Sequence, residues 1–157
     1  MDEKSIRQDK ELARAAIKGL TFYAELIAHQ GNEEEVRQVR SLVDAISLYW
    51  GVDGKRDWTE EFDEKVQRAR GEGRISGQCS SVFQLKTVKG LSRYAEEMAL
   101  VQGVEETDRI LEIPNMIRRL GKVWRMSPHD IERSCREIEE TANALQVSRQ
   151  AVQGMNL

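Results

Sequence analysis

The sequence predicts an all-α protein, a helical bundle of two tandem pseudo-symmetric three-helix repeats with about six main helices. The first observation is an internal repeat: residues 17–28 align with residues 88–99, with identity at seven of twelve positions. The second is that apolar residues recur at helical spacing through both halves. The third is composition, because proline occurs only twice and runs of β-branched residues are scarce. Together these patterns favour helices over strands.

The first repeat, residues 1–72, is expected to contain three helices. The first spans about residues 5–30 and ends at Gly31, because a glycine after a helix readily takes the left-handed conformation. The second spans about residues 33–50, with three glutamates in the first turn, where the helix dipole favours negative charge. The third begins at Thr59, an N-cap candidate. The apolar stripes of these helices predict a core made of Leu12, Ala16, Leu20, Tyr23, Ile27, Val36, Val39, Val43, Ile46, Trp50, Phe62, Val66 and Ala69.

The second repeat, residues 73–157, reproduces this pattern with small shifts. Its middle helix has the same 3-4-3-4 spacing of apolar residues and also ends in a tryptophan, Trp124. Pro114 lies inside that helix and is expected to kink it. Ser127 is expected to cap the last helix, with Pro128 in its first position. The predicted core consists of Phe83, Thr87, Leu91, Tyr94, Met98, Ile110, Ile113, Ile117, Leu120, Ile131, Cys135 and Ile138.

Gly19 and Gly90 occupy the same place in the two repeats, in the middle of a predicted helix. Glycine at such a position costs about 1 kcal/mol relative to alanine. Its presence in both repeats indicates that another backbone approaches closely there. We therefore expect the first helix of each repeat to cross the other near these two glycines, and the repeats to pack about a local two-fold axis. Apolar residues at a 3-4-3-4 spacing can also pack against a second copy of the chain, so a homodimer is a further possibility.

The net charge of −3 conceals an alternating pattern. Residues 1–64 carry −6, residues 65–93 carry +6, residues 94–113 carry −5, and residues 114–157 carry +2. The basic block indicates either a surface for phosphates and nucleic acid or a set of cations that pair with the acidic blocks, within the fold or across a dimer. Its members are Lys65, Arg68, Arg70, Arg74, Lys86, Lys89 and Arg93. Of these, Lys86, Lys89 and Arg93 are candidate nucleic-acid-binding residues.

The sequence offers little for membrane insertion, metal binding or catalysis. No stretch approaches the length of apolar residues that a membrane span needs, and the N-terminus does not resemble a signal peptide, so we expect a cytoplasmic protein. The two cysteines, Cys79 and Cys135, lie far apart, which disfavours a disulfide framework or a zinc site. Glu25 and His29 are one helical turn apart, but the second repeat does not preserve the pair. We predict no catalytic residue, metal or cofactor.

The strongest functional pattern lies at the C-terminus, in residues 140–152. Leu145 falls before an expected turn, Val147 lies within the turn, and Ser148 is placed to cap a following helix. This arrangement resembles the helix-turn-helix of DNA-binding regulators. The resemblance implies that the second helix reads base edges in the major groove, where Arg and Gln form paired hydrogen bonds. The residues that it would place against DNA are Ser148, Arg149, Gln150 and Gln153.

Two features depart from that resemblance: Gln146 stands where a glycine is usual, and only a short recognition helix follows. Residues 147–150 also align with residues 75–78, so the segment is alternatively the start of a third repeat. The leading hypothesis is a small DNA-associated protein, a transcriptional regulator that reads DNA through this segment. The alternative is an adaptor or assembly subunit that binds another protein and does not read DNA sequence.

Overall fold

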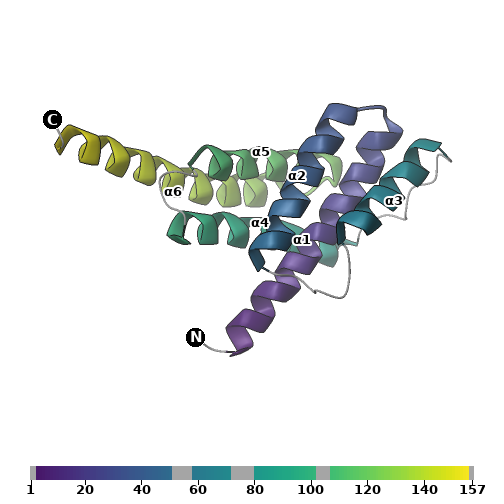
Figure 1. Cartoon of the computed structure of the whole chain (residues 1–157), viewed down its shortest axis with the longest axis horizontal. Coiled ribbons are helices and arrows are strands. Elements are labelled where there is room, and N and C mark those ends of the chain that lie inside the picture. Colours follow the sequence, from purple (N-terminus) through teal and green to yellow (C-terminus); the bar gives the residue numbers. More distant parts are fainter. Residues whose placement is uncertain (1–2, 51–57, 72–79, 102–106, 156–157) are drawn as a thin grey trace. The chain divides into compact units, whose positions relative to one another are not determined.

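The computed structural model describes residues 3–50, 58–71, 80–101 and 107–155, and every regular element within these ranges is an α-helix. The helices are α1 (Glu3–His29), α2 (Glu33–Trp50), α3 (Trp58–Gly71), α4 (Ser81–Val101), α5 (Thr107–Val123) and α6 (Pro128–Met155) (Figure 1). The prediction of an all-α bundle is confirmed. For a few helix ends, notably residues 3–8 and 148–155, the backbone alone is described.

The chain forms two compact units, residues 1–90 and residues 91–157. The first unit contains α1, α2, α3 and the first half of α4. The second contains the rest of α4 together with α5 and α6. The predicted boundary between residues 72 and 73 falls in a segment outside the described residues and stays a prediction.

In the first unit, α1 packs against both α2 and α3. Each of these helices buries one stripe of apolar residues at a spacing of three and four, because that spacing brings side chains onto one face. Nearly every predicted core residue of the first repeat is buried; the exceptions are Leu12 and Trp50, which are partly exposed. The apolar periodicity therefore predicted the core of this unit correctly.

The connection between α1 and α2 shows why each helix ends or begins where it does. Gly31 has a φ of +85°, in the left-handed region. Its N–H donates to the carbonyl of Ala28 at 3.0 Å, and the N–H of Asn32 donates to that of Ile27 at 2.9 Å. This pair of bonds closes the last turn of α1. The Asn32 side chain then accepts from the N–H of Glu35 at 3.3 Å and so caps α2.

α3 begins at Trp58, one residue before the predicted start at Thr59, so Thr59 lies in the first turn of the helix. Sequence signals for helix starts scatter by a residue or two, because several neighbouring residues can accept the first free N–H groups. The start of α6 agrees with its prediction. Pro128 is its first residue, and the N–H of Ile131 donates to the carbonyl of Ser127 at 3.1 Å.

Within the first unit, α1 and the first half of α4 approach each other at the two glycines. A Cβ atom on Gly19 would lie 2.1 Å from the Thr87 hydroxyl oxygen. A Cβ atom on Gly90 would lie 2.4 Å from the carbonyl oxygen of Leu12. Both distances are far below van der Waals contact, so only glycine fits at either position. The predicted close approach at Gly19 and Gly90 is confirmed.

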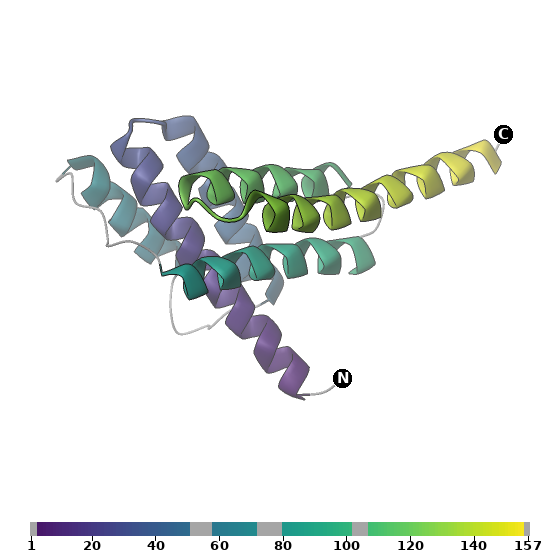
Figure 2. The same ribbon diagram turned by 180° about the vertical axis from the view of Figure 1, so that it is seen from behind.

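In the second unit, α5 and α6 pack against each other along α5, joined by a short turn (Figure 2). α5 continues on both sides of the fully buried Pro114, and the kink expected there stays a prediction. The turn after α5 places Arg125 at a φ of +54°, and the N–H of Met126 donates to the carbonyl of Gly121 at 2.9 Å. The predicted core residues of the second repeat that lie in this unit are all buried: Leu91, Tyr94, Met98, Ile110, Ile113, Ile117, Leu120, Ile131, Cys135 and Ile138. The other two lie in the first half of α4, where Thr87 is buried but Phe83 is only half-buried, so the prediction of Phe83 as a core residue is wrong.

Candidate binding surface and pocket on helix α6

The segment expected to form a helix-turn-helix is instead part of one helix. α6 runs without interruption from Pro128 to Met155, so Val147 and Ser148 are helical and the implied turn is not there. The physical reason is local: Gln146 replaces the glycine that would supply a left-handed turn, and glutamine is a good helix former. Ser148 is accordingly an interior residue of a helix and does not cap one.

The candidate DNA-contacting residues are distributed over both units. Ser148, Arg149, Gln150 and Gln153 lie in the last turns of α6, and their side chains are outside the described part of the structure. Lys86 and Lys89 belong to the first unit, and Arg93 to the second. Lys86 pairs with Glu11 at 3.5 Å. DNA contact by any of these residues stays a prediction.

The basic block is largely paired with acidic residues inside each unit. Exposed ion pairs of this kind contribute about 0–1 kcal/mol each, but they reduce the positive potential available to a phosphate backbone. For five of the six described members, these pairs agree with the alternative in which the charge blocks pair within the fold. The exposed Lys89 forms no ion pair with another described residue, and Arg74 lies outside the described residues. The pairs are Lys65–Glu61, Arg68–Glu64, Arg70–Glu33, Lys86–Glu11 and Arg93–Glu97.

The C-terminal part of α6 extends past the helix against which it packs. α6 has 28 residues and α5 has 17. At about 1.5 Å per residue the two helices are about 42 Å and 26 Å long, so about ten residues of α6 continue beyond the start of α5. Figures 1 and 2 show this end of α6, in yellow, with no described helix of its unit beside it. We call residues 143–155 the α6 extension.

The α6 extension is weakly charged, and most of its described side chains face solvent; Leu145 is half-buried. Among the α6 residues whose side chains are described, Ala142 is the last buried one, whereas Asn143 and Ala144 are exposed and Val147 is 65% exposed. Between residues 141 and 157 the sequence carries a single charged residue, Arg149. A protruding helix of this composition differs from an ordinary solvated helix end, which is rich in charge.

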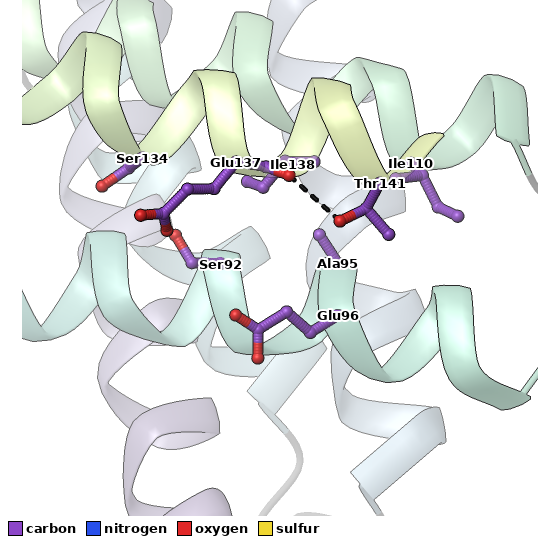
Figure 3. Close-up of a pocket in the computed structure, with 8 residues that line it drawn as sticks. All are labelled: Ser92, Ala95, Glu96, Ile110, Ser134, Glu137, Ile138 and Thr141. Carbon is purple, nitrogen blue, oxygen red and sulfur yellow. Dashed lines mark hydrogen bonds between the residues drawn. The ribbon is translucent and has the colours of Figure 1, made fainter. Parts of the chain in front are cut away.

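A small pocket lies beside α6 in the second unit, on the stretch that precedes the extension. Its volume is about 60 Å³. Figure 3 shows side chains from α4 and α6 facing each other across it. The polar lining consists of two carboxylates and three hydroxyls, and the remaining lining is apolar. The lining residues are Ser92, Ala95, Glu96, Ile110, Ser134, Glu137, Ile138 and Thr141.

Two polar groups of this pocket lack an internal partner. The Ser92 hydroxyl oxygen is buried and makes no hydrogen bond within the described structure. No ion pair joins the exposed Glu137 carboxylate to another described residue, although its backbone carbonyl accepts from the Thr141 hydroxyl at 3.0 Å. Glu96, by contrast, pairs with Arg93 at 3.2 Å. A buried hydroxyl without a partner is rare enough to require an explanation.

Another side of α6 is occupied by an ion-pair network with α5. Arg118 donates to Glu132 at 3.0 Å and to Glu139 at 2.8 Å. The hydrogen bond from Arg118 lowers the pKa of Glu132, and the hydrogen bonds that Arg118 donates to Glu139 and to Glu132 raise the pKa of Arg118 itself. These charges pair with one another within the unit, so the network joins α5 to α6. The polar groups that lack a partner lie on the pocket side of α6.

Cys135 lies in the core of the same unit and is not a nucleophile candidate. Burial raises the pKa of its thiol to about 11, and the thiol donates to the carbonyl of Pro114 at 3.4 Å. A thiol with such a pKa holds almost no thiolate at neutral pH. In the described residues, no three His, Cys, Asp or Glu side chains gather to hold a metal ion.

Comparison with protein-family models, with curated proteins and with solved structures found no match for this chain. Across the described residues, no helix is long and apolar enough to cross a membrane. Two features of α6 therefore bear on function, the extension and the pocket. The pocket has no signature in the sequence, because its lining residues come from three helices that are separated along the chain.

Proposed function

We propose that this protein is an adaptor that binds another protein, with the α6 extension packed into an apolar groove of a helical partner. The observation that carries the proposal is the continuation of α6 past α5 as a weakly charged helix with Val147 65% exposed. Ala144, Val147 and Ala151 recur at the three- and four-residue spacing by which a helix fills such a groove. Burying this stripe supplies the hydrophobic driving force for association.

The same features favour a protein partner over DNA. A recognition helix needs cations free to reach phosphates, whereas most of the described basic block is paired with carboxylates. The extension itself offers a single cation, Arg149, among its apolar and amide residues. Reading of DNA by Arg149 and Gln150 remains the competing hypothesis, and the test below separates the two.

The test places a photo-crosslinking amino acid at Val147 and, as a matched control, at Leu48. Leu48 lies on α2 in the other unit and is 85% exposed, so it is an apolar position at least as accessible as Val147. We expect irradiation in the native host to give a defined protein adduct from position 147 and not from position 48. Val147→Glu, which introduces a charge into the stripe, should prevent copurification of that protein, while Leu48→Glu should not.

DNA binding is tested in parallel, by measuring whether the native protein retards DNA fragments in a gel at low salt. We expect no retardation that depends on Arg149 and Gln150. Retardation that disappears when both are replaced by alanine, together with equal crosslinking from positions 147 and 48, would replace the adaptor proposal with DNA reading.

A further inference from the structure

The pocket of the second unit occupies a place where the first repeat carries cations. Aligning the third helices by their core residues, Phe62 with Ile131 and Val66 with Cys135, places Lys65 opposite Ser134 and Arg68 opposite Glu137. Two basic side chains of the first repeat are therefore a hydroxyl and a carboxylate in the second.

α4, which lies across the pocket from α6, has an acidic residue at the same repeat position as α1. The alignment of residues 17–28 with 88–99 matches Glu25 with Glu96. The second repeat has thus kept the anion and lost the cations. What remains is the cavity of about 60 Å³, with Glu137 added to its rim. A single water needs about 10–15 Å³ of such space, so the cavity has room for several waters or for the end of a side chain.

The lining of the pocket specifies the kind of cation. Hydroxyl and carboxylate oxygens are acceptors that suit an ammonium group, which has three donors and no acceptor. An ammonium would also give the buried Ser92 hydroxyl oxygen the partner it lacks. Ala95, Ile110 and Ile138 line the rest of the pocket and suit a methylene chain. A lysine side chain combines these two parts, since it buries its stem against apolar surface and directs its charge to polar groups.

The position of the pocket connects it to the α6 extension. Ser134, Glu137 and Thr141 follow one another on α6 at intervals of three and four residues, and Ala144 continues the same face into the extension. A helix that packs along the extension can therefore also reach the pocket. We infer that the pocket binds the side chain of a lysine supplied by the partner protein, an inference that rests on the proposed function.

The pocket is tested with a lysine probe, Nα-acetyl-lysine methylamide, by following backbone amide signals in NMR titrations. The matched control probe carries a further acetyl group on the side-chain nitrogen, which removes the charge and keeps the stem. We expect saturable shifts at Ala95 and Ile138 with the first probe and none with the second.

Three variants make this test specific. Glu137→Gln should lower the affinity for the lysine probe by at least about tenfold, because it removes a charge-assisted hydrogen bond. Ser134→Lys restores the first repeat's residue and should abolish binding by filling the pocket from within. Glu140→Gln changes an exposed carboxylate of the same helix outside the pocket and should leave binding unchanged. Circular dichroism checks that each variant remains folded.

Two results would overturn the inference. The first is the absence of shifts at the pocket amides, or equal shifts with the uncharged probe; this leaves crosslinking from Val147 intact and so spares the adaptor proposal. The second is probe binding combined with crosslinking from Val147 that Glu137→Gln does not weaken. In that case the pocket takes a free amine and not a lysine of the partner.

Discussion

Replacing Gly90 with alanine tests the close approach of α1 and the first half of α4 within the first unit. The added Cβ atom would lie 2.4 Å from the carbonyl oxygen of Leu12 and 2.9 Å from the Cβ atom of Ala16. The first contact is with a helix backbone, which cannot rotate away as a flexible side chain does. The strain is therefore relieved only by moving one helix relative to the other.

The size of the effect follows from two opposing contributions. Adding a methyl group to a tightly packed interior costs about 1–3 kcal/mol, and a clash with backbone belongs at the upper end of that range. Alanine recovers about 1 kcal/mol of helix propensity relative to glycine. We therefore expect Gly90→Ala to lower the free energy of unfolding by about 2 kcal/mol. In a chain of 157 residues this corresponds to a fall of about 4–8 °C in melting temperature.

The matched control is Gly71→Ala, at the last residue of α3. A Cβ atom there meets nothing within 4 Å, so the substitution should change stability by less than about 0.5 kcal/mol. Both variants are compared with the native protein by urea denaturation, followed by far-ultraviolet circular dichroism. If Gly90→Ala proves as stable as Gly71→Ala, the two helices do not approach at Gly90 as described.

Three further predictions concern single residues of the second unit. Arg125→Gly should raise stability by about 0.5–1 kcal/mol in urea denaturation, since the φ of +54° strains any residue with a Cβ atom, and Arg125→Ala should not. In a Cys79→Ala protein, alkylation of Cys135 at pH 8 should be limited by unfolding. Because burial raises its pKa from 9.0 to about 11, its contribution to stability is complete below pH 9 and is lost towards pH 11, which denaturation at each pH measures. Arg118→Met should lower stability by about 1 kcal/mol in thermal melts, more than Arg133→Met, because Arg118 joins two glutamates across helices whereas Arg133 pairs only with an aspartate in its own helix.

The sequence predicts those parts of this fold that depend on local periodicity. Val36, Val39, Val43 and Ile46 are buried because a spacing of three and four places them on one face of α2, whatever α2 packs against. The same reasoning applies to their counterparts in α5. Repetition adds longer-range information, since a glycine kept at positions 19 and 90 identified a close contact between helices far apart in sequence.

The features that the sequence did not predict depend on what several helices bring together. The pocket forms where α4, α5 and α6 meet, and Ser92 and Glu137 are unremarkable in their own helices. The missing turn in α6 is a different case, because the helix-turn-helix pattern relies on a glycine that this chain replaces with Gln146. Helix propensity favours a continuous helix through Gln146, and it outweighs a helix-turn-helix motif that lacks its glycine.

Comparing the repeats within the chain indicates where function has diverged from fold. Most of their core positions match, because each repeat buries apolar stripes of the same spacing. Their third helices differ in length: α3 has 14 residues, whereas α6 has 28. The same two helices also differ at the pocket positions, where Lys65 and Arg68 of α3 align with Ser134 and Glu137 of α6. Both changes leave the core intact and alter only what α6 presents to solvent. Packing requires neither change, and this is why we propose α6 as the element that binds a partner.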